Sequence, residues 1–520
     1  MFKKILRDCS LLPIIILGSC TTYRGVPKAI NKPKMLPLGE TKRTAPITNV
    51  ERDVSYAPLY TKSENEQKSS IRDVFDFSKY IEKKPAFSNS PAFEEDYNQN
   101  ENRESVATRP AEDGVLRIAV LLPIETQNMK VAEDLKNAAT MALFDAKSKN
   151  TILQFYDTNG TYDDAKEKAK TAVSEGADVI VGPLFAEEVK GASRGAGKVP
   201  VISFTTDTTA LSGNVFSIGF LMEQQIKRIV EYAVQNGKSK FAIIVSDSES
   251  GKFVRDSFKK YVSQNNAELV ADVKYNAKTT TDLMKAVKEV SNFDNRKAEY
   301  DEYKQSVKDR YDYLLKLKES NPTEYKNAFD SEQFLSSEDE LSFMEKTLSD
   351  LEKKLTISEP EYDSIFIFGD DINNVLMIGS SLMYYDVHPD KVQYLGTSQL
   401  ENPKVYSERA FRGAWYPSVS TKYSGKFDSA YKKYFNRAPI KIASLAYDAV
   451  SLVNSLGEDK GTVEQKDILN PNGWTGINGI FRFKYNGSSE RNMDIKQVIG
   501  GAVEKTRIIS PAQLNFLQEK

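Results

Sequence analysis

The hydrophobic pattern of the chain changes at about residue 113, where a polar segment gives way to alternating apolar runs. Leu116–Pro123 is a nearly continuous apolar run, as expected of a strand buried on both faces of a parallel sheet. Val131–Lys147 then has the three- and four-residue spacing of an amphipathic helix. Further strands are predicted at Ile152–Phe155, Val179–Val181, Val199–Phe204, Phe241–Val245, Leu269–Tyr275, Ile365–Phe368 and Val392–Leu395. This alternation predicts an α/β fold built on doubly wound parallel sheets.

Residues 293–358 interrupt this alternation with two charged helical segments, each of which carries an apolar stripe. The second stripe has heptad spacing and consists of Leu341, Met344, Leu348, Leu351 and Leu355. The first consists of Tyr300, Tyr303, Val307, Tyr311 and Leu314. Because Asn321-Pro322 breaks the pattern between them, we expect an antiparallel helical hairpin inserted into a lobe. The stripes either pack on each other and on the lobe, or form an arm that docks a partner protein through Tyr303, Tyr311 and Leu348.

The first twenty residues have the pattern of a secretory signal. Basic residues precede the apolar run Leu11–Leu17, which is too short to span a bilayer core of about 30 Å. Leu17-Gly18-Ser19-Cys20 then matches the bacterial lipobox, in which the cysteine thiol is acylated. Residues 1–20 are therefore predicted to be a lipoprotein signal peptide, with Cys20 as the lipidation site. Thr21 is not an aspartate, which favours the outer membrane under the sorting rule of the lipoproteins that this segment resembles.

Residues 21–112 are predicted to form a disordered tether. They are rich in Lys, Asn, Ser, Glu and Pro and show no sustained helical or strand period, so they cannot bury enough apolar surface to offset their ordering entropy. As a random coil, such a segment reaches about 50 Å on average. The expected tether is therefore long enough to hold the body away from a membrane.

The residue inventory excludes several classes of function. The 520 residues carry a net charge of -2, without the basic excess that neutralises nucleic-acid phosphates. Only one histidine, His388, and two cysteines, Cys9 and Cys20, are present, so zinc sites and Cys/His or Ser/His/Asp nucleophiles are not expected. We predict no metal, no cofactor, no nucleic-acid partner and no enzymatic activity.

The body, about residues 113–508, resembles the type I periplasmic binding proteins, the superfamily of the leucine-binding protein. The segments that carry the resemblance follow in the family's order: Val115–Pro123, Phe155–Thr158, Gly176–Leu184, Val199–Phe204, Leu395–Thr397, Ile442–Val450 and Gly476–Phe483. It implies two lobes joined by three crossings, near residues 219, 396 and 478. Lobe 1 would hold about 115–219 and 396–478. Lobe 2 would hold about 220–395 and 479–508, with the hairpin 293–358 projecting from it.

Within this superfamily the chain is most similar to the penicillin-binding-protein activators, which are envelope lipoproteins that stimulate peptidoglycan synthases. The likeness rests on Tyr156-Asp157-Thr158, on Gly182–Val189 and on the lipobox. It implies a periplasmic, lipid-anchored regulator whose partner is a bifunctional peptidoglycan synthase. Some activators carry a helical-repeat domain before this fold, and here residues 21–112 stand in its place.

The alternative is the substrate-binding lipoprotein of a branched-chain amino-acid ABC transporter. In that branch, small and hydroxyl residues hold the ligand carboxylate at helix N-termini. Here the corresponding loop offers Phe185, Glu187 and Glu188, which would repel an anion, although Ser203-Phe204-Thr205 keeps hydroxyls for a small polar ligand.

Ligands of open α/β sheets bind beyond the carboxyl ends of the strands. That rule gives cleft candidates on one lobe, Asp157, Leu184, Ser203 and Thr205, and on the other, Asp247 and Asp370. Each aspartate has an alternative role as a cap of the following helix or loop. The sequence predicts neither the identity of a ligand nor the oligomeric state.

Overall fold

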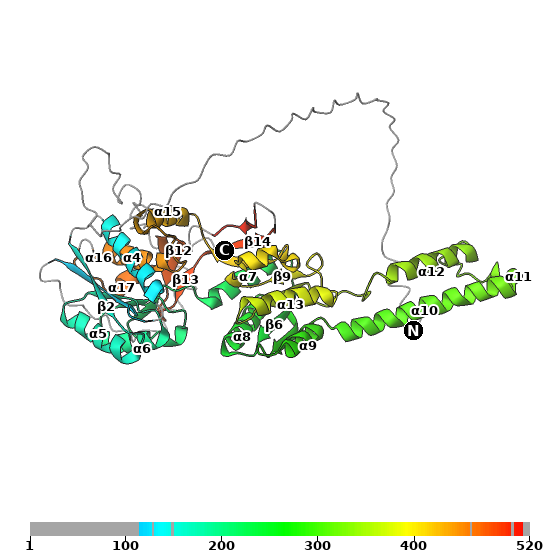
Figure 1. The fold of residues 1–520 in the computed structure, drawn as a ribbon, viewed down its shortest axis with the longest axis horizontal. Coiled ribbons are helices and arrows are strands. Elements are labelled where there is room, and N and C mark those ends of the chain that lie inside the picture. Colours follow the sequence, from blue (N-terminus) through cyan, green and yellow to red (C-terminus); the bar gives the residue numbers. More distant parts are fainter. Residues whose placement is uncertain (1–113, 127–128, 147–149, 458–459, 501–503, 513–520) are drawn as a thin grey trace, which may run out of the picture. The chain divides into compact units, whose positions relative to one another are not determined.

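The computed structural model describes residues 114–126, 129–146, 150–457, 460–500 and 504–512. The predicted signal peptide, Cys20 and the tether lie outside these residues. The described residues form two α/β lobes, and the predicted α/β fold with parallel sheets is confirmed (Figure 1).

The first sheet has five parallel strands in the order β2-β1-β3-β4-β5. They span β1 (Leu116–Leu122), β2 (Thr151–Asp157), β3 (Val179–Val181), β4 (Val201–Ser203) and β5 (Val215–Ser217). Alternate residues of β1 enter two separate apolar clusters, so the central strand is buried on both faces. Helices α4 (Met129–Asp145) and α16 (Ala443–Gly457) cover one face, and α5 (Tyr162–Ser174) and α6 (Ala186–Ala196) cover the other.

The second sheet has seven strands in the order β15-β14-β10-β9-β8-β6-β7. Its parallel part comprises β6 (Lys240–Ser246), β7 (Glu268–Tyr275), β8 (Ser364–Ile367), β9 (Gln393–Leu395) and β10 (Trp415–Val419). Two antiparallel strands, β14 (Met493–Val498) and β15 (Thr506–Ser510), complete the edge next to β10. Helices α7 (Met222–Gln235) and α8 (Glu249–Gln264) pack on one face, and α9 (Thr280–Val290) and α13 (Ile372–Tyr384) on the other.

A small antiparallel sheet joins the first lobe near the end of the chain. It consists of β11 (Trp474–Gly476), β12 (Gly479–Phe483) and β13 (Ser489–Arg491). Trp474, Phe481 and Phe483 insert into the apolar cluster that lies between α4, α16 and the first sheet. The first lobe also contains α15 (Ser424–Phe435) and α17 (Gln465–Ile468), while η2 (Thr208–Ala210) follows β4. Between β9 and β10 lie η3 (Ser398–Leu400), α14 (Pro403–Ser407) and η4 (Arg409–Phe411).

Two of the three expected crossings between the lobes fall elsewhere in the structure. The chain enters the second lobe between β5 and α7, near residue 219, but it leaves only after β10 rather than near 396. The sequence hides β10 because Pro417 lies in its middle and cannot donate to a ladder. The third crossing lies between β13 and β14, not near 478, because Phe481 and Phe483 pack in the first lobe.

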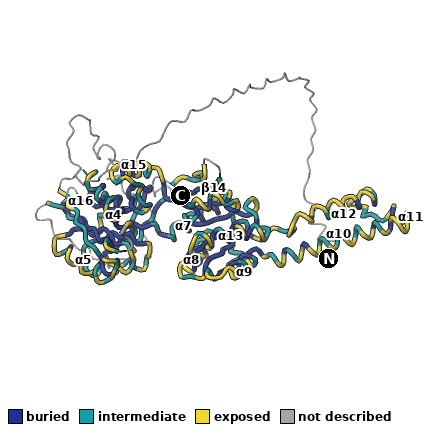
Figure 2. The backbone as a smooth tube through the Cα atoms, viewed as in Figure 1, coloured by how far each residue is buried: buried dark blue, intermediate teal, exposed yellow. Residues whose placement is uncertain are grey.

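The segment 293–358 forms the expected helical hairpin. Helices α10 (Phe293–Ser320), α11 (Pro322–Tyr325) and α12 (Ser337–Leu351) pack through a cluster of Leu314, Leu317, Tyr325 and Leu341. In Figure 2 the dark, buried segments concentrate in the lobes, whereas the hairpin alternates buried and exposed residues along its helices. The hairpin is therefore held by a narrow seam of its own.

Candidate functional site

The strongest candidate site on the first lobe lies at the carboxyl end of β3, where Gly182-Pro183-Leu184 leads into α6. Gly182 has φ +91°, and a Cβ there would lie 2.2 Å from the Leu121 carbonyl oxygen, so this turn requires glycine. In an open α/β sheet, this is the place where the N-terminus of a helix receives an anionic ligand. What the site can bind therefore depends on the group that lies at the N-terminus of α6.

Glu188, in the first turn of α6, reaches back to the N–H group of the residue before the helix. Its Oε2 accepts from the Phe185 N–H at 2.9 Å, and its Oε1 accepts from the Thr158 hydroxyl. The Glu188 side chain is fully buried, and burial raises the pKa of its carboxyl above the usual value, although both hydrogen bonds act in the opposite direction. Glu187 instead points to solvent and pairs with Lys190 at 2.6 Å. The two carboxylates of this loop thus have different roles, which their adjacency in the sequence did not reveal.

The other predicted residues of the first lobe hold the backbone. Asp157 accepts from the N–H groups of Ile124 and Asn159 at 2.9 Å, and so ties the loop after β1 to the end of β2. The Ser203 hydroxyl donates to the Phe216 carbonyl, and the Thr205 hydroxyl accepts from the Asp207 N–H. Leu184 is half-buried against the core. Within this set, the structure favours capping over ligand contact.

The second lobe offers a more open polar group at the carboxyl ends of β6 and β8. Asp370 Oδ1 accepts from the hydroxyls of Ser246, Ser248 and Ser250 at 3.0, 2.6 and 2.8 Å. Burial alone would raise the pKa of Asp370, but the three hydroxyls together hold it below its usual value, so the carboxylate stays charged. Asp247 is exposed beside this cluster. Asp371 caps α13 by accepting from the N–H groups of Asn373 and Asn374.

One buried polar pair escaped the sequence analysis. Asp448 of α16 is 4% exposed and accepts from the Ile477 N–H at 2.8 Å, and burial raises its pKa to about 6. Arg491 of β13 opposes that shift electrostatically, and burial lowers the pKa of its own guanidinium to about 10. Asp448 is the only charged residue of α16, which is the signal that would have identified it.

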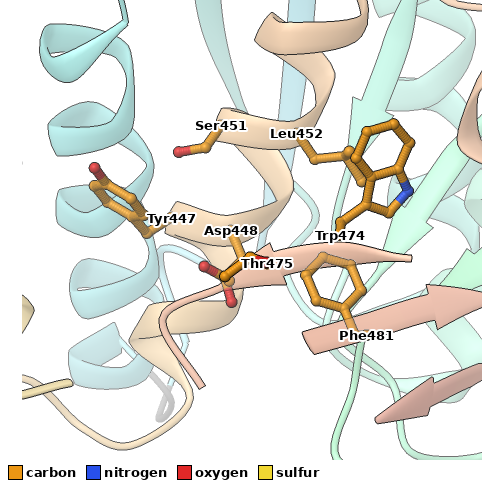
Figure 3. A pocket seen from close by; sticks show the side chains of 8 residues that line it. Tyr447, Asp448, Ser451, Leu452, Trp474, Thr475 and Phe481 are labelled. Carbon is orange, nitrogen blue, oxygen red and sulfur yellow. The ribbon is translucent and has the colours of Figure 1, made fainter. Parts of the chain in front are cut away.

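A small cavity lies beside Asp448 (Figure 3). Tyr447, Asp448 and Ser451 face it from α16, Trp474 and Thr475 from β11, and Phe481 from β12. It offers about 10 Å³ to the centre of a water molecule, which is room for about one water. Since ligand pockets are many times larger, this cavity is a packing feature of the first lobe rather than a ligand site.

The described residues include neither a metal-binding cluster nor a membrane-spanning helix. No group of three or more His, Cys, Asp and Glu side chains there is arranged to hold a metal ion. No helix in the same part of the chain has the length and apolarity needed to cross a membrane.

Comparison with known proteins is consistent with this architecture. Residues 115–293 match the family model described as periplasmic binding protein, and the match ends where the hairpin begins. No curated protein sequence matches the chain significantly. Among solved structures, one assigned as a branched-chain amino acid ABC transporter from Rhodospirillum rubrum is 16% identical, with a TM-score of 0.55, and covers 76% of this chain and 100% of its own.

A second similar structure is a branched-chain amino acid ABC transporter ligand-binding protein from Burkholderia xenovorans. It is 11% identical, has a TM-score of 0.51, and covers 77% of this chain and 96% of its own. An ABC transporter substrate-binding protein from Sphaerobacter thermophilus, 15% identical, has a TM-score of 0.50 and covers 76% and 96%. At these identities the likeness establishes the fold alone.

Proposed function

We propose that this chain, whose body has the two-lobed fold of the type I periplasmic binding proteins, is a non-enzymatic activator of a bifunctional peptidoglycan synthase. One observation carries the proposal. Thr158 and Glu188 belong to the two motifs that resemble the activator branch, and their side chains hydrogen-bond to each other in the core of the first lobe. The two motifs are thus joined by hydrogen bonds at the N-terminus of α6.

This network argues against capture of a free amino acid. A receptor of that kind needs unoccupied N–H groups at the helix N-terminus for the ligand carboxylate. Here the Phe185 N–H is already bound to Glu188, while Glu187 lies in the first turn of α6 and Asp157 ends β2. An incoming anion would have to displace a buried side chain and meet like charge.

A transport receptor is the second candidate, and the serine cluster on the second lobe favours it. Three hydroxyls surround the Asp370 carboxylate, and the exposed carboxylate of Asp247 lies nearby. Such a group suits the ammonium end of a small ligand. It is only half of an amino-acid site, and on the first lobe the Phe185 N–H before α6 is already bound to Glu188.

We further propose that the body is held in the periplasm by a lipid on Cys20, in the outer membrane, through residues 21–112 as a tether. Two or three acyl chains anchor a protein stably. A reach of about 50 Å would carry a regulator toward a partner embedded in another membrane, whereas a receptor that feeds a nearby permease has little need of it.

The deciding experiment uses the full-length chain in detergent. Calorimetry against leucine, isoleucine, valine and other amino acids is run beside a pull-down with the bifunctional peptidoglycan synthases of the same cell. We expect no heat from the amino acids and retention of a synthase. Binding of a free amino acid at micromolar affinity or tighter, about -8 kcal/mol, with no synthase retained, would overturn the activator proposal in favour of transport.

A further inference from the structure

At its base, the helical hairpin contacts the second lobe through a buried arginine, beside a ring contact of Phe293 with Tyr385 and an ion pair of Asp294 with Lys288. Arg296, in the first turn of α10, is 3% exposed. Its guanidinium donates to the carbonyl oxygens of Ser291, Ser358, Tyr385 and Asp386 and to the Thr356 hydroxyl, at 2.8 to 3.3 Å. These acceptors come from both ends of the hairpin and from the loop after α13. An arm attached in this way is positioned by the lobe rather than hanging from a free linker.

The end of the hairpin remote from Arg296 exposes large apolar side chains. Leu335 is 92% exposed, and Phe343 of α12 is 50% exposed while its ring packs on Phe334 at 5.3 Å. The candidates Tyr303, Tyr311 and Leu348 are less accessible, because each is half-buried and Tyr311 packs against the seam. We name Phe334, Leu335 and Phe343 the tip patch. Contiguous exposed apolar groups of this kind mark interaction surfaces.

The chain around the tip patch is strongly acidic. Residues 319–345 contain eight carboxylates and one lysine. Two of these carboxylates form ion pairs within the hairpin, since Glu340 binds Arg310 at 2.7 Å and Glu338 binds Lys318 at 2.6 Å. Glu332 and Glu345 are exposed on either side of the tip patch in the sequence. The segment that carries the tip patch therefore has a net negative charge.

The negative charge limits which kind of partner can bind the tip patch. A second copy would bring the same acidic tip, and anionic lipid headgroups would be repelled in the same way. A protein surface with basic residues around an apolar pocket complements both features. We propose that the tip patch is the docking surface for such a basic surface on the peptidoglycan synthase, an inference that rests on the function proposed above.

The test measures synthase binding by the full-length chain and two double variants at the tip. Leu335→Ser with Phe343→Ser removes the apolar contact, and Glu332→Lys with Glu345→Lys reverses the charge. Each should weaken binding about tenfold or more. Raising the salt concentration should weaken wild-type binding and affect the charge-reversed variant much less.

Matched controls lie on the lobes. Phe253→Ser changes an apolar residue of α8 that is 43% exposed. Glu167→Lys with Glu268→Lys reverses two exposed charges. Each of these two control variants should bind the synthase like wild type. All variants should have the wild-type melting temperature, measured by circular dichroism, because every substituted side chain is exposed to solvent. If wild type binds the synthase and the tip variants bind equally well, the tip proposal is wrong and the proposed function stands. If wild type binds no synthase, both are wrong.

Discussion

Glu187 and Glu188 are neighbours in the sequence, yet one is a solvent-exposed partner of Lys190 and the other is buried in the first lobe. The sequence predicted the loop that contains them and its acidic character. It could not predict which carboxylate turns inward, because that depends on Thr158 coming within reach at the end of β2, which is separated from β3 by β1 in the sheet. Side-chain direction at such loops is set by tertiary contacts that leave no local pattern.

The pair provides a matched test. Replacing Glu188 with alanine leaves the Phe185 N–H and the Thr158 hydroxyl without their acceptor in the core, so the free energy of unfolding should fall by about 2 kcal/mol. Glu187→Ala removes only an exposed ion pair and should change it by less than about 0.5 kcal/mol. Urea denaturation followed by circular dichroism measures both. Equal effects from the two substitutions would refute the role given to Glu188.

Asp448 gives stability a specific dependence on pH. Its pKa is raised from 3.8 to about 6 in the folded state, so the folded protein binds this proton more tightly than the unfolded chain does. The stability that Asp448 contributes is therefore complete below about pH 4 and decreases as the pH rises toward 6. Asp448→Asn lacks this titration. The difference in unfolding free energy, wild type minus variant, should fall across that range and level off above about pH 7.

Denaturation curves of both proteins at several pH values supply the measurement. The prediction concerns the slope alone, since asparagine also leaves Arg491 without its opposite charge at every pH. Parallel curves would mean that Asp448 titrates normally.

At the scale of elements, the sequence predicted the segments with a clear hydrophobic pattern, including the short strands β3 and β9, and missed the strands without one. The apolar runs of β1, β6 and β7 and the stripes of α10 and α12 are long enough to be read directly. β5, β11 and β13 have three residues each, and β10 contains a proline, so none carries a pattern that separates it from a loop. The positions of these strands are set by packing in the apolar cores of the lobes.

Arg296 is the element-scale contact that we expect to matter most. Arg296→Ala leaves five acceptors without a donor, two of them buried and three partly buried, and should lower the free energy of unfolding by about 3 kcal/mol. Its neighbour Lys297 pairs with Asp301 on the surface and lies over the Tyr300 ring, and Lys297→Ala should change stability by less than about 1 kcal/mol. Limited proteolysis should cut the arginine variant near 291–296 or 356–358 while the lobes stay intact. A cleavage pattern like that of wild type would show that the hairpin is held by other contacts.

At the scale of the whole molecule, the anchor decides where the lobes and the hairpin act. Cys20→Ser removes the thiol that the lipobox presents for acylation, so labelling with palmitate should be abolished and the chain should leave the membrane fraction or stay unprocessed. Cys9→Ser, which lies before the apolar run, is the matched control and should leave labelling unchanged. Labelling that persists in the Cys20 variant would rule out the predicted lipoprotein.

The contacts of Arg296 hold the two ends of the hairpin close together, so the hairpin could be replaced by another segment. Arg296 contacts the Ser358 carbonyl at 2.8 Å, and the Ser358 hydroxyl donates to Glu299, so the chain leaves and re-enters the lobe at one point. A few linker residues could therefore close the gap with little loop-closure entropy. The same junction could receive a fluorescent protein or an epitope at a known place on the lobe. The base of the hairpin is therefore a suitable position for inserting another folded segment.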